Sequence, residues 1–569
     1  MAGLIGTSLN IGRSALLSYQ SALQVVGQNV ANAGTDNYTR QSPQLAAMRG
    51  VPLPDGSIPG GGVTLASLQR HVDESLENRL RTAVGDRASA EIQQDVLRRI
   101  ESQYNELTDD DLSTRLSEFF AAWSDLQNRP EDLSARGVVV TTGEALAGSI
   151  RKVRQDLGDL RVEVDDRLAR LVERANELSE TIAALNQEIT DAESGGSSAS
   201  ALRDQRDLAL RQLSEIIELQ VRADGSAVNV FVANEPLVLY SDSRGLLADR
   251  LTDDGAQDTV IRFADNGGQV TVVGGQAQGL IVSRDGHVDG QIDRLDTLAG
   301  ALIEEVNRVH AAGQGLEGFE ALTGLNDVLD ETVALSDAEQ TGLAATVVNG
   351  SFQVRVHNEA AGTSQTHLIE VDLDGIGADT TLATLAAAID AASADLTATV
   401  TGDKRLSIVA NNGFSFTFAE DTSGALGALG MNAYFTGRDA RDIGINAMLK
   451  TTPTRVAAAT QNLPADGSNA GNLAQVGGTG ATRLGGLSLT DYYDATIGQL
   501  AVDTSAARSG FEAADVLYGA LSAQRESVSG VSLDEETVSL MRYQRAFQGA
   551  ARYITVVDEL VQEMLNIAR

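Results

Sequence analysis

Residues 16–41 read LLSYQSALQVVGQNVANAGTDNYTRQ, an apolar helical pattern that runs into a sharply polar turn. Apolar or small residues recur in alternating steps of three and four through the first thirty positions, the heptad spacing of a helix that pairs with another helix. The residues at these positions are Leu9, Gly12, Leu16, Tyr19, Leu23, Val26 and Val30. The stretch therefore predicts an N-terminal helix that packs along a partner helix.

The C-terminus carries a matching heptad pattern. Its members are Leu540, Tyr543, Phe547, Ala550, Ile554, Val557, Val561 and Met564. At either end alone, a single amphipathic helix lying on a globular core would explain the pattern equally well. Because the two ends carry matching seams, we expect them to pair with each other. We expect the apolar residues of both seams, Gly12 and Ala550 apart, to form an assembly interface.

The polar turn after the first helix reads NVANAGTDNYTRQ, residues 29–41. Asn32 and Gly34 are suited to cap the helix C-terminus, since glycine and asparagine tolerate the left-handed backbone found there. We interpret the turn as a hinge between the terminal helix and the next domain. Its predicted residues are Asn29, Asn32, Gly34, Asn37 and Tyr38.

Composition excludes several classes of protein. A formal net charge of −36 argues against nucleic acid as a partner, because binding phosphates needs a basic surface. The chain has no cysteine, so disulfides, thiolate catalysis and zinc–thiolate sites are excluded. No stretch resembles the apolar region of a signal peptide or a membrane span, so we expect no membrane insertion and, for an exported protein, a route other than general secretion.

Between the ends the apolar periodicity alternates between helical and strand-like. Helices are predicted at 66–128, with a break in YNELTDDDLS that Thr108 and the aspartates would cap, and at 133–193, 201–219, 290–313 and from about 480 onward. A small β unit is predicted at about 221–285, and β-like segments recur at 345–420. The predicted fold class is α+β multidomain: a long antiparallel helical bundle or coiled coil formed by both chain termini, with inserted β-rich modules.

Three domains follow from this order of elements. The predicted terminal helical assembly domain comprises 1–32 and 533–569. The long-helix bundle domain, which holds the small β unit, comprises 33–335 and 436–532. The outward β-rich domain comprises 336–435.

The candidate chemical motifs are weak. GQGLEG matches the spacing of a dinucleotide-binding loop, but it follows a predicted helix instead of a strand. DLDGIGAD resembles the start of a calcium loop, yet Ala383 stands where a bidentate glutamate is required. RDQRD at 203–207 indicates a solvated, ion-paired helix face. We expect no catalytic, cofactor-binding or metal site and classify the chain as a non-enzyme.

Several segments resemble the bacterial flagellar axial proteins, the family of rod, hook and junction subunits. LLSYQSALQVVGQNVANAGTDNYTRQ is similar to the family's N-terminal segment, with Asn37 where glycine is usual. SGVSLDEETVSLMRYQRAFQGAARYITVVDELVQEML (529–565) is similar to its closing helix. LRDQRDLALRQLSE, GGQAQGLIVSRD and AYFTGRDARDIGIN resemble the hook-associated junction members in particular.

The resemblance implies a structural subunit of the extracellular flagellum, on the hook side of the hook–filament junction. It implies self-assembly into a ring or tube and contact with the hook protein, a second hook-associated junction protein and the flagellin filament. It also implies export from the cytoplasm by the flagellar type III apparatus, without a cleaved signal peptide. A cytoplasmic export chaperone would bind the C-terminal region.

Two alternatives stay open. The first is another flagellar axial protein, a hook or distal-rod subunit, although the long internal helices argue against this. A secreted enzyme or glycan-binding protein would place its function in the β-rich modules, but it gives no reason for apolar seams at both ends.

Overall fold

The structure is a computed structural model that describes residues 2–35, 37–50, 58, 60–104, 111–195, 198–253, 256–461, 463 and 465–567. The chain forms two compact units, each assembled from segments far apart in the sequence. Unit 1 comprises Met1–Gln94, Val164–Val282 and Ala507–Arg569, and unit 2 comprises Asp95–Glu163 and Ser283–Ala506.

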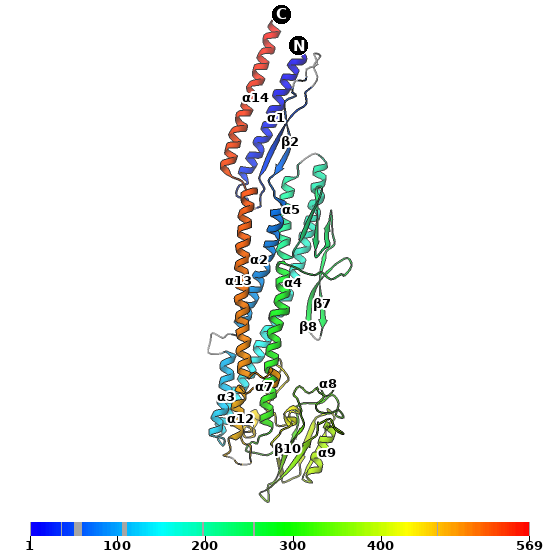
Figure 1. The fold of residues 1–569 in the computed structure, drawn as a ribbon, viewed down its shortest axis with the longest axis vertical. Helices are drawn as coiled ribbons and strands as arrows, with labels where there is room; N and C mark the ends of the chain where they lie inside the picture. The colour runs from blue at the N-terminus through cyan, green and yellow to red at the C-terminus, as the bar shows by residue number, and fades with distance from the viewer. Residues whose placement is uncertain are drawn as a thin grey trace. The chain divides into compact units, whose positions relative to one another are not determined.

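Unit 1 is built mainly from long helices. Its helical elements are α1 (Ala2–Ala31), α5 (Ser200–Ile216), α6 (Gly275–Val282) and α14 (Leu533–Ile567), with parts of α2 (Glu74–Tyr104), α4 (Leu133–Ser194) and α13 (Leu489–Ser529). In Figure 1, α1 and α14 lie side by side and both chain ends lie at the same end of the pair. A small cluster of Leu76, Leu80, Ala83 and Leu521 joins α2 to α13.

Three antiparallel sheets belong to unit 1. The first is the hairpin of β1 (Gln41–Ala47) and β2 (Val63–Arg70). The second orders β3 (Gln220–Asp224), β4 (Ala227–Val232), β5 (Glu235–Leu239) and β6 (Asp242–Ser243) consecutively, and the third pairs β7 (Leu246–Asp253) with β8 (Ala256–Phe263). Asn186 of α4 holds the second sheet. Its buried side chain donates to the Val228 carbonyl and accepts from the Val228 backbone N–H.

The helical part of unit 2 surrounds a buried aromatic cluster. Its larger helices, besides parts of those above, are α3 (Leu112–Asn128), α7 (Asp289–Ala311) and α12 (Ser468–Gln475). Short elements are the π-helix η1 (Ser283–Val288), α10 (Ala425–Ala428), the pair β15 (Phe435–Thr436) and β16 (Gly444–Ile445), α11 (Ala447–Thr451), and the 3₁₀ turns η2 (Pro453–Arg455), η3 (Val476–Gly478) and η4 (Thr482–Leu484).

A β-rich module forms the rest of unit 2. One sheet has the order β11 (Thr363–Val371), β10 (Gly350–Asn358), β14 (Phe414–Ala419), and the other has β12 (Leu396–Val400), β13 (Leu406–Ala410), β9 (Ala321–Thr323). Helices α8 (Ala338–Thr341) and α9 (Leu382–Ala392) accompany them. Phe352, Val354, Ile369, Phe416 and Phe418 share one buried core with α9.

The predicted α+β fold class is confirmed: the long terminal helices pack together, and small antiparallel sheets are inserted between helical segments. The helix predicted from residue 66 is wrong at its start, because 63–70 is strand β2 and α2 begins at Glu74.

Asp111 caps α3 as expected by accepting a hydrogen bond from the Thr114 amide. Thr108, the other predicted cap, lies outside the described residues. The three-domain boundaries stay a prediction.

The GQGLEG glycines have a packing role. A side chain at Gly313 would meet Asn469, one at Gly315 would meet the backbone of Thr454, and one at Gly318 would meet Ser415. The segment follows α7 and runs against neighbouring backbone, so glycine is needed for close approach.

His310 is fully buried beside the aromatic cluster of unit 2, which contains Phe119, Trp123, Tyr434 and Phe435. Its Nε2 accepts from the Ala457 amide at 3.0 Å, so its Nδ1 carries the proton and donates to the Asn432 carbonyl at 2.8 Å. The centroid of the imidazole ring lies 6.0 Å from that of the Trp123 ring and 5.4 Å from that of the Tyr434 ring. The pKa of His310 is lowered to about 4, mainly by burial; the hydrogen bond to the Asn432 carbonyl opposes this shift, and the positive charge of Arg136 adds to it.

His310 should make unit 2 sensitive to acid. Below its ordinary pKa of about 6.5 the unfolded chain binds a proton that the folded chain does not accept until about pH 4, so the free energy of unfolding falls as pH falls between these values. The loss should reach roughly 3 kcal/mol, at about 1.4 kcal/mol per pKa unit. Trp123 is the chain's single tryptophan, so urea titrations followed by its emission report this region.

The comparison variant is His310→Gln, whose side chain stays neutral at every pH used. Its free energy of unfolding should fall less between about pH 6.5 and pH 4 than that of the unchanged chain. His71→Gln, in unit 1, is the matched control and should leave the Trp123 transition unchanged. An unaltered pH dependence in His310→Gln would contradict the assignment.

Candidate assembly site at the paired chain ends

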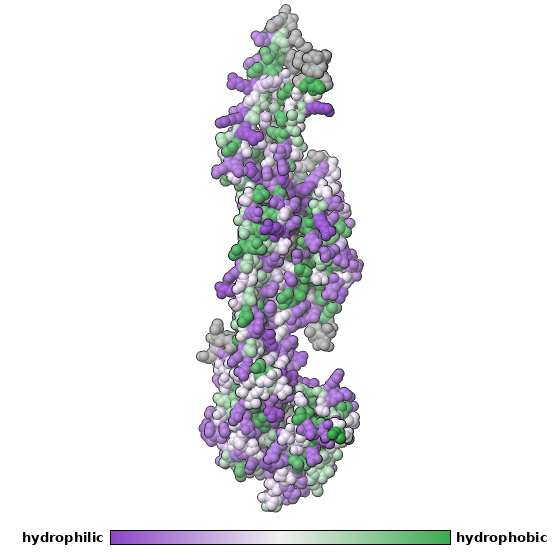
Figure 2. Space-filling model, viewed as in Figure 1, coloured by the Kyte–Doolittle hydropathy of each residue, from purple (hydrophilic) through white to green (hydrophobic). Residues whose placement is uncertain are grey.

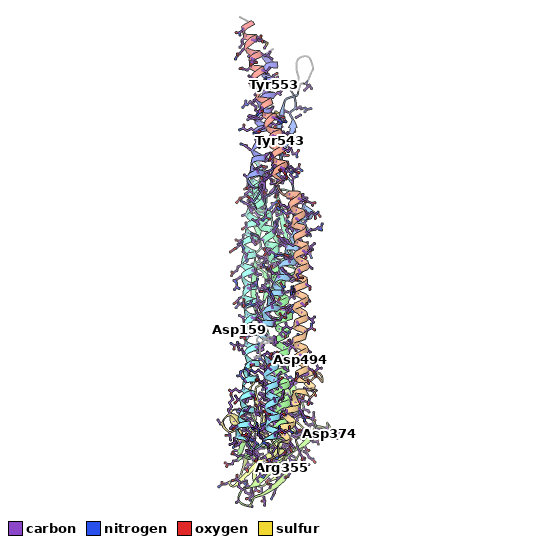
Figure 3. All side chains as sticks on the ribbon, turned by 90° about the vertical axis from the view of Figure 1, so that its left-hand side faces the viewer. Asp159, Arg355, Asp374, Asp494, Tyr543 and Tyr553 are labelled. Atoms are coloured by element: carbon purple, nitrogen blue, oxygen red, sulfur yellow. The ribbon has the colours of Figure 1, made fainter. Side chains whose placement is uncertain are left out.

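The first component of the site is the antiparallel pair of α1 and α14. The heptad spacing of each helix puts its apolar residues on one face, and these faces meet. Ala22 and Val26 of α1 form a buried cluster with Tyr543 of α14, and Tyr19, Leu23, Leu45 and Leu540 pack around it. In Figure 3, Tyr543 and Tyr553 mark the stretch of α14 that lies beside α1. The predicted mutual pairing of the chain ends is confirmed.

The predicted seam residues of α14 follow this contact closely. Tyr543 and Val557 are buried, and Leu540, Phe547, Ile554, Val561 and Met564 are half-buried. On α1, Val26 is buried and Leu9, Leu16, Tyr19 and Leu23 are half-buried, whereas Val30 is 42% exposed. Val30 therefore lies off the buried seam. The role of all these residues as contacts to other subunits stays a prediction.

The two helices approach each other closely at Gly12. A Cβ atom at this position would overlap the side chain of Ile554 and touch the ring of Tyr553. Because glycine has no Cβ, Ile554 can seat against the α1 backbone. By contrast, a Cβ at Gly27 of the same helix would meet nothing within 4 Å.

A second apolar stripe runs along α14 on the side turned away from this seam. We call Val538, Met541, Val556 and Leu560 the outward stripe; their side chains are between 46% and 63% exposed. Figure 2 shows apolar residues at the surface of the helix pair. On its other side α1 is covered by the β1–β2 hairpin, and Ser18 Oγ donates to the Val63 carbonyl at 3.0 Å. The outward stripe has no such cover within the chain's described residues.

The second component of the site is a buried polar cluster where α1 ends and α14 begins. The Asn29 amide nitrogen donates to the Gln41 carbonyl at 2.8 Å and to Glu536 Oε2 at 3.0 Å. Its oxygen accepts from the Gln41 amide at 3.2 Å and from the Tyr38 hydroxyl at 2.9 Å. Both hydrogen atoms and both lone pairs of the side-chain amide are therefore used.

Glu536 is the charged centre of this cluster and is 2% exposed. Arg40 Nε donates to its Oε1 at 2.8 Å, so each carboxylate oxygen has a partner. Arg40 Nη1 also donates to Glu535, whose side chain is 62% exposed. Burial, together with the negative charges of Asp204 and Glu536, raises the pKa of Tyr38 to about 12, so the hydroxyl keeps its proton at neutral pH.

A second charge cluster lies on the other side of the segment 37–41. Glu77 accepts from Arg525 Nε at 2.8 Å and from Arg211 Nη2 at 3.3 Å. Arg211 also donates to the side chain of Asn37, and Arg525 Nη2 donates to the Asn37 carbonyl at 3.3 Å. Side chains of α5, α13 and α14 thus bond to this segment directly, and Glu77 of α2 holds the two arginines in place.

The backbone of the turn differs from the simplest expectation. Gly34 was expected in the left-handed C-cap conformation, but Asn37 is the residue with a positive φ, of 65°. Asparagine tolerates this conformation better than most other residues with a side chain. Asn32 does follow the last turn of α1, with its amide bonded to the Gln28 carbonyl at 3.1 Å. Whether the turn acts as a hinge stays a prediction.

The RDQRD segment is ion-paired as expected, but the interpretation of it as a solvated face is wrong. Asp204 and Asp207 both accept from Arg70 at the end of β2, at 2.5 and 2.7 Å. Arg206 is buried and donates to Asn186 and to the Ser226 carbonyl. Sequence reasoning missed Arg70 because it lies more than 130 positions from its partners.

The described residues of the paired ends offer surfaces for binding. Among the described residues, no three His, Cys, Asp or Glu side chains are placed to hold a metal ion. No helix within the described ranges is long and apolar enough to cross a membrane. The charged side chains of the site form ion pairs between segments that are far apart in the sequence. Such pairs are suited to hold the chain ends in place.

Comparisons with known proteins agree with this arrangement. Residues 97–325 match a family model described as the flagellar hook-associated protein FlgK helical domain, and residues 523–567 match the flagellar basal body rod FlgEFG protein C-terminal model. The chain is 25% identical to flagellar hook-associated protein 1 of Escherichia coli, covering 98% of this chain and 99% of that protein. It is 24% identical to the protein of the same name from Bacillus subtilis, covering 98% and 97%.

A solved structure supports the fold. The flagellar hook junction protein FlgK from Burkholderia pseudomallei superposes with a TM-score of 0.50 at 18% identity, covering 79% of this chain and 100% of that one. The curated relatives are structural flagellar proteins and not an enzyme family, in agreement with the expected non-enzyme class.

Gly12→Ala should weaken the helix pair, although alanine is the better helix former. The added Cβ overlaps Ile554, and such overpacking costs about 1–3 kcal/mol. Gly27→Ala is the matched control: nothing obstructs its Cβ, so it should stabilise α1 by roughly 0.5–1 kcal/mol. Rates of limited proteolysis within residues 1–31 measure both effects, and equal stabilisation by both variants would contradict the close approach.

Glu77→Ala should strongly destabilise unit 1. It leaves the buried Arg525 and the partly buried Arg211 without their shared carboxylate, a loss of about 3–5 kcal/mol in the free energy of unfolding. Glu535→Ala removes a solvent-exposed partner of Arg40 and should change little, because exposed ion pairs contribute little. Urea unfolding followed by far-UV circular dichroism compares the two, and a similar small effect for both would count against the buried cluster.

Proposed function

Because this chain belongs to the flagellar hook-associated protein 1 family, we propose that it is a structural subunit on the hook side of the hook–filament junction. The observation that carries this proposal is the match over 98% of the chain, which includes both paired ends. In this role the protein joins the hook to the next junction protein and to the flagellin filament. It acts outside the cell, in the flagellum.

The helix pair supplies the assembly surface in this proposal. The seam residues of α1 and α14 hold the pair together, and the outward stripe remains for neighbouring copies in a ring or tube. Burying such a stripe is favourable by roughly 0.8 kcal/mol per methylene, offset by the entropy lost when the helices are ordered. A partner helix packed along Val556 and Leu560 would cover side chains that are now about half exposed.

The remaining partners follow from the family. We propose that one end of the ring contacts the hook protein and the other contacts the second hook-associated junction protein. Export occurs through the flagellar type III apparatus without a cleaved signal peptide, and a cytoplasmic chaperone binds the C-terminal region. The exposed apolar residues of α14 support this last step, because a lone α14 needs cover before assembly.

The proposed division of labour follows the domains expected from the sequence. Segments 1–32 and 533–569 form the assembly domain. Segments 33–335 and 436–532 form the wall of helices with its small β unit, and 336–435 projects outward. The alternative of a hook or distal-rod subunit is disfavoured, because the hook-associated helical domain matches at 97–325.

Val556→Asp combined with Leu560→Asp tests the outward stripe. Both carboxylates point away from the seam, so the chain should still fold, but burial in a subunit interface would leave two unpaired charges. We expect cells carrying this variant to make intact hooks and to shed flagellin into the medium, as a deletion strain should.

Ile376→Asp is the matched control, since Ile376 is 79% exposed in a loop of the β-rich module. It should leave filament attachment intact. Normal filaments on hooks of the double variant would overturn the assembly role of the stripe.

A further inference from the structure

The heptad seam leaves the register of α1 against α14 open. A seam that repeats every seven residues packs again when one helix slides by seven positions, about 10 Å. The nine residues between the end of α1 and the start of β1 span up to roughly 30 Å when extended, so their length permits such a slide. In the slipped register, Ala22 of α1 would stand opposite Ala550 of α14.

The polar cluster distinguishes the observed register from its neighbours. Asn29 faces Glu536 only in this register, where every hydrogen-bonding position of its amide is used and both Glu536 oxygens are paired. A slide of seven positions would place Tyr543 opposite Asn29. Glu536 would lose the Asn29 amide, and the 0%-exposed Asn29 side chain would lose partners in an apolar seam.

An independent steric contact agrees with the same register. Gly12 precedes Asn29 by 17 positions, and Ile554 follows Glu536 by 18, so the two contacts mark one antiparallel alignment. The hydrogen bond between Asn29 and Glu536 and the close contact of Gly12 with Ile554 therefore favour the same register. The slipped alignment would bring Tyr19, in place of Gly12, to Ile554.

We propose that Asn29 and Glu536 form a register lock: they are positioning residues that set which heptads of α1 and α14 face each other. A single buried polar residue in an otherwise apolar helix seam is known to select register at some cost in stability. The lock acts within one chain, so it goes beyond the proposed function and holds whatever partner covers the outward stripe. It decides how far α1 extends along α14.

Cysteine cross-linking tests the lock directly, because the chain contains no cysteine of its own. The native reporter is Ala15→Cys with Ala550→Cys, since both positions are fourteen residues from the Asn29–Glu536 contact. The slipped reporter is Ala22→Cys with the same Ala550→Cys. Each pair is oxidised in the purified full-length protein and scored as the fraction of intramolecular disulfide on non-reducing gels.

The two reporters are then combined with changes at the lock. Glu536→Leu removes the carboxylate and should raise the ratio of slipped to native cross-link about tenfold, the effect expected when hydrogen bonds to a charged group are lost. Glu536→Gln keeps an acceptor for Asn29 and should retain the native register. Glu535→Leu makes the same change at the adjacent, exposed carboxylate and should also leave the ratio unchanged.

Each other outcome overturns the proposal. Exclusive native cross-linking in Glu536→Leu would show that another contact sets the register. Loss of both cross-links in that variant alone would show that Glu536 stabilises the pair without selecting its register, and a slip in Glu535→Leu would show a general effect of charge. Failure of the native reporter in the otherwise unchanged chain would show that the pair does not form as described.

Discussion

The buried carboxylate of Glu536 is the contact on which the paired ends of this chain depend. It binds Asn29, 507 positions earlier in the sequence, and Arg40 just beyond the turn. A carboxylate removed from water is costly unless each oxygen is paired, so Glu536 requires α1 and the start of β1 to be in place. The Glu77 cluster repeats this arrangement on the other side of the segment 37–41 and ties it to α2, α5 and α13.

Pairing the ends leaves α14 with two apolar faces of different use. The face toward α1 is covered within the chain, and Gly12 allows a close approach at Ile554. The outward stripe has its apolar side chains in solvent, which is unfavourable for an isolated subunit and suited to one that is covered after assembly. The proposed function explains this exposed stripe, because a ring or tube of identical subunits would supply identical neighbours to cover it.

Much of the fold could be predicted because its signals are local. The heptads of α1 and α14 and the long helix α4 were found from spacing alone, and the strands of the β-rich module from their alternation. The hairpin of β1 and β2 was missed because QSPQLAA and VTLASLQR hold few bulky β-formers, and Pro43 argues against a strand. RDQRD was expected to be solvated because Arg70, which pairs with Asp204 and Asp207, comes from a distant segment.

The amino-acid sequence by itself determined the helices, the matching seams at the two ends, the small sheets between them and the family likeness. Each of these is encoded in spacings of a few residues, where backbone geometry alone sets which side chains share a face. Only the tertiary structure decided that Asn37, and not Gly34, takes the left-handed conformation, that Arg70 neutralises Asp204 and Asp207, and that Asn29 meets Glu536. Buried charges are paired by whichever segments packing brings together, and a seam with a seven-residue repeat does not specify its own register.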